Sequence, residues 1–372
     1  MRKEQIKKFI ACNIPMSACN LKCHYCYISQ LSQWERNKVD FALNPAQIEK
    51  ALSADRLGGT CIINLTGKGE TLIPKEMPEV IRRLLEQGHF LEVVTNGTLT
   101  NRFEEIAEFP RELLERLEFK FSFHYLELKE RGWMERFFNN VNKMRERGCS
   151  FTLELMPNDE IVPYIEDIKR VCIENVEALC HLTIGRDDTD ARKILTKIPI
   201  EEYLKAWQQF DSNMFNFKYS VFNVKRCEFC YAGMWSLYVD LATGDTRQCY
   251  GLPVIQNIYK DINKPLYYRP VGRKCRQPYC YNAHAFMSLG VIPEIDTPTY
   301  ADIRDREGRD GNHWLTEKLR DAFASKLVDS NEKVEGIKHF GYYLSTPAYF
   351  VRLPINEKKK LLRRIKRKIT GK

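Results

Sequence analysis

The stretch SACNLKCHYCYIS, residues 17–29, decides how this sequence is interpreted. It holds three cysteines, Cys19, Cys23 and Cys26, separated by three and then by two residues. Thiolates this close together favour a shared metal centre, either a zinc ion or an iron–sulfur cluster. A tetrahedral zinc site needs a fourth ligand, for which Cys12 or His24 is available. A cluster held by three thiolates keeps one iron open to a small molecule.

The composition is that of a globular protein, with 44% hydrophobic and 29% charged residues in a chain of 372. No apolar run reaches the roughly 18 residues of a transmembrane helix, and the N-terminus lacks a secretory signal, so we expect a cytoplasmic protein. In a reducing compartment its 13 cysteines are expected to be metal ligands or buried thiols. The cysteines expected in the core are Cys12, Cys61, Cys149, Cys172 and Cys180.

The first 215 residues alternate short apolar runs with helical patterns, which predicts βα units and a parallel sheet. The expected strands are 9–13, 60–66, 90–95, 119–124, 150–156 and 178–185. The expected helices are 44–55, with Asn44 as N-cap and Pro45 as first helical residue, and 75–87, 102–117, 133–147 and 164–174. Six strands are too few for an eight-unit barrel. The predicted fold class is therefore α/β, with a partial (β/α)6 TIM-like barrel over residues 1–217.

The three-cysteine loop resembles the C-x3-C-x2-C loop of the radical S-adenosylmethionine (SAM) family. The family's loop follows the first strand and has an aromatic residue before the last cysteine, here Tyr25. The resemblance implies that Cys19, Cys23 and Cys26 hold a 4Fe–4S cluster whose open iron binds SAM, and that Tyr25 lies at the cofactor. It also implies reductive cleavage of SAM to a 5′-deoxyadenosyl radical, which removes a hydrogen atom from a substrate.

The stretch NLTGKGETLI, after the second expected strand, resembles the family's Gly-Gly-Glu segment. Gly67 and Gly69 permit a close approach of the backbone to a ligand, and Glu70 can accept hydrogen bonds from an ammonium group. The resemblance implies that this group is the methionyl amine of SAM. The sequence departs from the family's commonest form at Lys68, between the glycines, and at Thr71, where proline is usual. A simple glycine-rich turn between strand and helix is the alternative interpretation.

The fourth expected strand, FKFSFH, alternates phenylalanines, expected to pack under outer helices, with polar residues expected to line the barrel interior. Ser122 and His124 belong to the polar set, and Glu154 on the fifth strand shares its face. The resemblance implies that Ser122 contacts SAM and that Thr95 and Asn96, at the end of the third strand, lie near its ribose. His124 and Glu154 are candidates for handling substrate or protons, with ordinary polar residues of a wet interior as the alternative.

A second cysteine group lies in residues 218–282, a loop-rich segment in which a hairpin is expected around residues 243–245. The expected ligands of a metal centre are Cys230, Cys249, Cys275 and Cys280. Their spacing around Gly244 resembles the C-x9–15-G-x4-C signature of SPASM and twitch extensions, which implies one auxiliary 4Fe–4S cluster. Cys227 is a fifth candidate for the four positions, and a zinc site remains the alternative.

The net charge of +9 is concentrated at the C-terminus, where residues 357–372 carry nine basic residues and one acidic residue. The near-neutral remainder argues against binding to nucleic acid and against RNA modification. Apolar residues at helical spacing make this tail a candidate for peripheral contact with an anionic membrane, with a frayed, solvated end as the alternative. Residues 283–356 are expected to form a mixed, partly α-helical extension with one clear helix at 315–327.

These features predict an oxidoreductase-like radical SAM enzyme that acts on a peptide or protein, by analogy with other extended members of the family. The alternatives are a sugar or aminoglycoside substrate and, in another class, a non-catalytic scaffold that holds zinc. Besides SAM and the substrate, the expected partner is an electron donor such as flavodoxin or ferredoxin. The auxiliary cluster is expected either to accept the product electron or to anchor the substrate.

Overall fold

The computed structural model describes residues 4–34, 41–260, 262–273 and 275–335. Within these ranges the strands form a nine-stranded sheet in the order β6-β5-β4-β3-β2-β1-β7-β8-β9. Strands β1 to β6 are parallel to their neighbours, as successive βα units require. The strand order ends at β6 and β9 without closure, which confirms the expected partial barrel. The strands are β1 (Lys8–Ile14), β2 (Cys61–Gly67), β3 (Phe90–Thr95), β4 (Leu117–Ser122), β5 (Ser150–Leu155), β6 (His181–Leu182), β7 (Ser236–Asp240), β8 (Asp245–Arg247) and β9 (Val254–Asn257).

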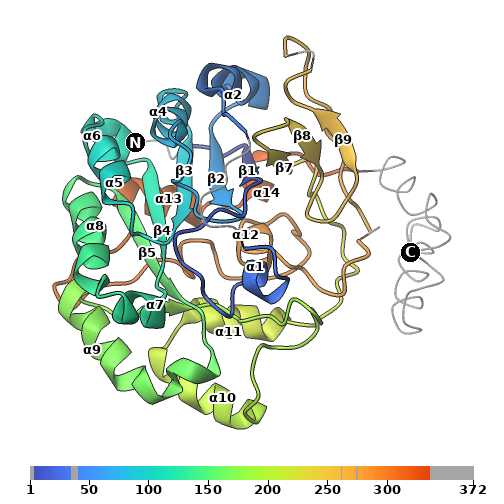
Figure 1. The fold of residues 1–372 in the computed structure, drawn as a ribbon. Coiled ribbons are helices and arrows are strands. Elements are labelled where there is room, and N and C mark those ends of the chain that lie inside the picture. Colours follow the sequence, from blue (N-terminus) through green and yellow to red (C-terminus); the bar gives the residue numbers. More distant parts are fainter. Residues whose placement is uncertain (1–3, 35–40, 261, 274, 336–372) are drawn as a thin grey trace, which may run out of the picture.

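Helices cover the convex, outer side of the curved sheet (Figure 1). In the described part of the chain, none of them is long and apolar enough to cross a membrane. The α-helices are α1 (Tyr27–Gln30), α2 (Pro45–Ala51), α3 (Ala54–Leu57), α4 (Met77–Glu86), α5 (Thr100–Ala107), α6 (Arg111–Leu114), α7 (Tyr125–Glu130), α8 (Met134–Glu146), α9 (Ile165–Val176), α10 (Ile200–Trp207), α11 (Asn213–Val221), α12 (Ala283–Phe286), α13 (Glu317–Ala324) and α14 (Leu327–Ser330). Short 3₁₀ helices are η1 (Asp159–Tyr164) and η2 (Gln208–Phe210).

Local sequence signals explain several boundaries of these elements. Asn44 caps α2 as predicted, because its side chain accepts a hydrogen bond from the Gln47 amide at 3.1 Å. The prediction of one helix over 102–117 was wrong: Pro110 separates α5 from α6, since proline lacks an amide hydrogen and restricts the residue before it. The sixth strand pairs over two residues only, far less than the predicted span of 178–185.

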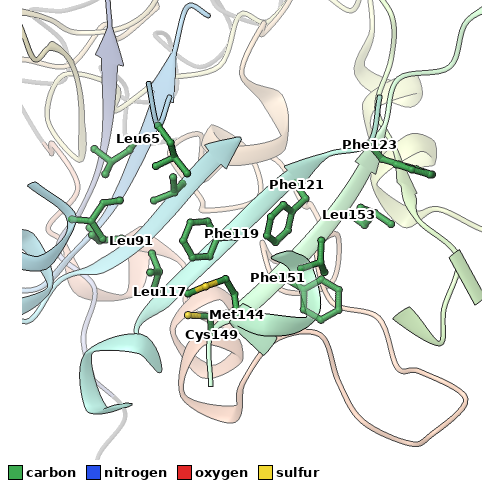
Figure 2. Packing of buried hydrophobic residues seen from close by; sticks show 14 of the residues in the cluster. Leu65, Leu91, Leu117, Phe119, Phe121, Phe123, Met144, Cys149, Phe151 and Leu153 are labelled. Atoms are coloured by element: carbon green, nitrogen blue, oxygen red, sulfur yellow. The ribbon is translucent and has the colours of Figure 1, made fainter. Parts of the chain in front are cut away.

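The outer face of the sheet carries the larger hydrophobic core. Phe119, Phe121 and Phe123 are at most 1% exposed and belong to the buried cluster on this face, as predicted; Figure 2 shows them among other members of the cluster. Their rings meet aromatic rings of those helices: Phe103 lies 5.3 Å from Phe119, and Phe137 lies 5.8 Å from Phe121, between ring centroids. The five cysteines expected in the core are all buried, which confirms that prediction for Cys12, Cys61, Cys149, Cys172 and Cys180.

The inner, concave face of the sheet is covered by residues 283–330, which occupy the middle of the curve in Figure 1. Ile62 on β2 and Phe90 on β3 belong to the same buried cluster as Leu289 and Phe323 from this segment. The described part of this segment contains α12, α13 and α14 among non-helical stretches. The helix predicted at 315–327 is present as α13.

A buried arginine joins this segment to the strands. Arg304 is 0% exposed, and its guanidinium lies 3.0 Å from Glu118 on β4 and 3.1 Å from Glu154 on β5. A third carboxylate, Glu92 on β3, lies 3.4 Å away, and Lys120 pairs with Glu154 at 2.7 Å. Burial alone would raise the pKa of Glu154, but Lys120 and Arg304 together lower it to about 2. One cation therefore holds three consecutive strands against the segment that fills their concave side.

The segment after α11 extends the same sheet. β7 pairs in parallel with β1, and β8 and β9 follow antiparallel to it. The hairpin expected around residues 243–245 joins β7 to β8, and Gly244 has the positive φ, 78°, that its turn requires. The boundaries proposed between residues 217 and 218 and between 282 and 283 stay predictions. The basic tail, 357–372, lies outside the described residues.

We expect Arg304→Met to destabilise the fold by about 3–5 kcal/mol, because it would leave three buried carboxylates without their shared counter-ion. Urea unfolding of the purified variant measures this change. Arg309→Met is the matched control, since Arg309 is exposed, and it should change stability by less than about 0.5 kcal/mol. Equal stability of the two variants would show that the arginine does not hold the sheet to residues 283–330.

Candidate functional site

The three cysteines lie together in the loop between β1 and α1. Cys19, Cys23 and Cys26 pack into one small cluster with Leu21 and Tyr25. Burial raises the pKa of the Cys19 thiol to about 12 and also raises the pKa of Cys23 and of Cys26. A group of adjacent thiols shielded from water is the donor set that an iron–sulfur cluster uses. The residues present therefore fit the centre that the spacing predicts.

Neither residue considered as a fourth zinc ligand joins this group. Cys12 lies in the core on the outer face of β1. The Nε2 atom of His24 lies 3.5 Å from a carboxylate oxygen of Glu160. Within the described ranges, no three Cys, His, Asp or Glu side chains form a group that could hold a single metal ion.

The glycine-rich segment holds the cysteine loop by a run of backbone hydrogen bonds. The amides of Lys68, Gly69 and Glu70 donate in turn to the carbonyls of Ile14, Met16 and Ala18, at 3.0, 2.6 and 2.9 Å. A Cβ atom at Gly69 would lie 1.9 Å from the Ala18 carbonyl oxygen. Glycine at position 69 therefore allows its backbone to approach the backbone of Ala18 closely, whereas the sequence suggested a close approach to a ligand.

Three of the predicted SAM contacts, Glu70, Thr95 and Asn96, lie next to one another. Thr95 and Asn96 each donate a hydrogen bond to Glu70. The Glu70 carboxylate accepts hydrogen bonds from the Thr95 hydroxyl at 2.7 Å and the Asn96 amide at 2.7 Å. It also accepts one from the Leu72 amide at 3.0 Å. Burial raises the pKa of Glu70, and these hydrogen bonds oppose that shift. Glu70 thus connects the loop after β2 to the end of β3.

His124 and Tyr25 form a second connection to the cysteine loop. The Tyr25 hydroxyl lies 2.6 Å from His124 Nδ1, and the two rings are stacked with centroids 5.9 Å apart. Burial lowers the pKa of His124 to about 4, so its ring is neutral at neutral pH. Ser122 lies half-buried at the end of β4, before His124. Of the two predicted catalytic residues, His124 reaches the cavity described next, and Glu154 is held by Lys120 and Arg304.

A cavity of about 300 Å³ lies between the two cysteine groups. Tyr25, Cys26 and His124 line one side of it. Tyr279, Cys280 and Tyr281, from the second group, line another. One cavity therefore has a cysteine of each predicted cluster site in its wall, although these residues are far apart in the sequence.

Sequence reasoning missed the charged residues of this cavity. Lys218, on α11, lines the wall, donates a hydrogen bond to Thr183 Oγ1 and has a pKa lowered to about 8 by burial. Arg186 and Asp188 line it as an ion pair at 2.7 Å. None of these residues belongs to a sequence motif. They reach the cavity because α11 and the loop after β6 fold back toward the cysteine loop. The one local signal is a lysine in an otherwise largely apolar helix.

The second cysteine group lines a smaller cavity of about 40 Å³. The residues that contribute thiols to its wall are Cys230, Cys249, Cys275 and Cys280. Cys227 is not among the residues that line this cavity. Burial raises the pKa of Cys280 to about 12, with a smaller contribution from Cys275, and Cys249 is also close to both. Four thiols around one enclosed space fit a four-iron cluster and favour the set predicted from the spacing.

Comparison with known proteins gives one family match. The family model described as Radical SAM superfamily matches residues 13–171, which span β1 to α9 and include the three-cysteine loop. No curated protein matches the sequence significantly.

Solved structures with a similar fold share little sequence with this chain. SuiB from Streptococcus suis has 16% identity and a TM-score of 0.47, over 69% of this chain and 64% of SuiB. The protein anSMEcpe, with bound AdoMet and the Cp18Cys peptide, has 15% identity and a TM-score of 0.47, over 92% of this chain and 96% of its own. The aligned part is less than two thirds of SuiB. These identities and scores are too low to transfer a function from either protein.

We expect Gly69→Ala to abolish assembly of an iron centre in the cysteine loop, because the new methyl group would push the loop off the segment after β2. Iron and labile sulfide per chain, after anaerobic reconstitution, measure this loss. Gly88→Ala is the control: Gly88 has a positive φ, +79°, which Gly69 lacks, so its backbone tolerates alanine less well, but no atom lies within 4 Å of its added Cβ. Full iron content in the Gly69 variant would contradict the role assigned to this contact.

Proposed function

We propose, from the radical SAM domain that residues 13–171 of this chain form, that the protein is a radical SAM enzyme acting on a substrate bound in the 300 Å³ cavity. Proteins of this family use a 4Fe–4S cluster and SAM. The observation that carries the proposal is the shared wall of the cavity, which contains Cys26 from the first cysteine group and Cys280 from the second. A substrate held there would lie between both centres.

The residues assigned to each group follow from their positions. Cys19, Cys23 and Cys26 would hold the cluster that supplies the electron for cleavage of SAM. Cys230, Cys249, Cys275 and Cys280 would hold the auxiliary cluster. An external electron donor such as flavodoxin or ferredoxin remains part of the proposal.

The chain's own residues give the cavity its chemical character. Aromatic side chains from Tyr25, Tyr279 and Tyr281 keep much of the wall apolar. Neutral His124, fixed by Tyr25, offers a ring nitrogen at a set position, which suits orientation of a substrate better than removal of a proton. Lys218 adds a cation that makes no ion pair within 4 Å in the described structure. We therefore propose that the bound substrate presents its reacting C–H group to the cysteine loop and a polar group to Lys218.

The size of the cavity favours one side chain of a peptide or protein over an aminoglycoside of several sugar rings. Ligand pockets of enzymes span about 300–1,000 Å³, so this one is at the lower end of the range. The cavity must admit the reacting parts of both SAM and the substrate. A single amino-acid side chain fits that space better than a molecule of several sugar rings.

The auxiliary site favours an electron acceptor over an anchor for the substrate. Four cysteines line its cavity, so each iron of a four-iron cluster would have a protein ligand and none would be left for a substrate atom. Cys280 lines both cavities, so its backbone and side chain form part of the partition between them.

The proposed activity is tested by incubating the reconstituted protein with SAM and dithionite and measuring 5′-deoxyadenosine. We expect product from the wild type and none from Cys19→Ala, Cys23→Ala or Cys26→Ala. Cys149→Ala should retain the activity, because Cys149 is buried in the outer core and belongs to neither cysteine group. A wild-type protein that holds zinc without labile sulfide would overturn the enzyme proposal in favour of the scaffold.

The auxiliary site predicts a difference between two cysteine variants. Wild-type protein should contain about eight irons per chain, and Cys280→Ala about four, because the second cluster loses a ligand. Cys227→Ala should keep the wild-type content, since Cys227 is not part of the cavity wall. Iron analysis of the three proteins checks this. Loss of half the iron in the Cys227 variant, with none lost in the Cys280 variant, would reverse the ligand assignment.

A further inference from the structure

Asn96 contacts the cysteine loop directly. Its amide nitrogen, Nδ2, lies 3.8 Å from the Sγ atom of Cys19, within reach of a hydrogen bond to sulfur. The same nitrogen donates to Asn20 Oδ1 at 2.7 Å. Asn96 is 4% exposed, so water does not compete for this donor. The sequence placed Asn96 near the ribose of SAM, whereas its side chain here faces a predicted cluster ligand.

Hydrogen bonds on the other side of the amide fix this orientation. Asn96 Oδ1 accepts from the backbone amide of Thr98 at 3.1 Å and from the Thr98 hydroxyl at 2.7 Å. The Thr98 hydroxyl accepts in turn from Asn20 Nδ2 at 2.7 Å. Both Thr98 groups donate to Oδ1, so a flipped Asn96 side chain would place its NH₂ group against two other hydrogen-bond donors. The network therefore leaves Nδ2 directed at Asn20 and Cys19.

The backbone of Asn96 is held as firmly as its side chain. Its amide donates to Glu70 Oε2 at 2.7 Å, and Glu70 is itself joined by its own amide to the Ala18 carbonyl at 2.9 Å. Ala18 directly precedes Cys19. Hydrogen bonds from Asn96 to Glu70 and from Glu70 to Ala18 therefore fix the distance between Asn96 Nδ2 and Cys19 Sγ.

We propose that Asn96 is a positioning residue whose hydrogen bond to the Cys19 sulfur sets the reduction potential of the cluster held by the cysteine loop. The inference rests on the proposed function, because it requires a cluster at Cys19. Reduction adds one electron and makes the cluster and its thiolates more negative. A hydrogen-bond donor stabilises the more negative state more strongly, so it raises the potential and makes the cluster easier to reduce.

The test is an EPR-monitored redox titration of the holoprotein, following the signal that changes when SAM is added. We expect Asn96→Leu to lower the potential, with about a tenfold smaller ratio of reduced to oxidised cluster at a fixed applied potential, or about 59 mV for a one-electron couple. Asn140→Leu is the matched control. Asn140, on α8, is also buried, and it donates a hydrogen bond at 2.9 Å to the carbonyl of Gly97, the residue after Asn96. The described structure shows no hydrogen bond between Asn140 and a cysteine.

A second variant keeps the test decisive if the first loses iron. Asn96→Asp keeps the shape and can still accept both hydrogen bonds from Thr98, but it places a carboxylate oxygen toward the sulfur. It should lower the potential further than Asn96→Leu. Unchanged or raised potentials in iron-loaded Asn96 variants would overturn the inference and leave the proposed function intact. Wild-type protein without any cluster would instead overturn the proposed function.

Discussion

The close approach of the Gly69 and Ala18 backbones is the constraint on which the site depends. It leaves no room for a side chain at residue 69, and it fixes the cysteine loop against the end of β2. Glu70, the next residue, accepts hydrogen bonds from Thr95 and Asn96, which join this segment to the end of β3. The positions of the three thiols therefore depend on the parallel strands next to the loop, and strands position a site more precisely than loops do.

The concave side of the open sheet shows how the chain stabilises a barrel that does not close. Residues 283–330 fill the interior with apolar side chains, and Arg304 adds a cation shared by carboxylates of β3, β4 and β5. On the other flank, β7 pairs with β1 and so covers a strand edge that the open sheet would otherwise expose. The 300 Å³ cavity lies between the cysteine loop, α11 and residues 279–283.

Local patterns were enough to predict β1 to β5 of the partial barrel, the outward phenylalanines around β4 and the two groups of cysteines that the fold brings together. Each of these depends on spacing within a short stretch of sequence. The rest depends on contacts across more than a hundred residues, which no local pattern encodes. Arg304 meets Glu92, β7 meets β1, and Lys218 enters the cavity only because the chain returns to the inner face of the sheet. Gly69 was identified as important, but the partner it approaches could not be read from its neighbours.

The central claim is that the three-cysteine loop holds a cluster with one iron open to SAM. The most direct measurement is electron–nuclear double resonance on the reduced protein with SAM labelled by ¹⁵N and ¹⁷O in its amino-acid group. We expect hyperfine couplings from the label, which would show that atoms of SAM bind the cluster. A reduced cluster signal with saturating SAM and no coupling to the label would contradict the claim, because the fourth iron position would then be closed.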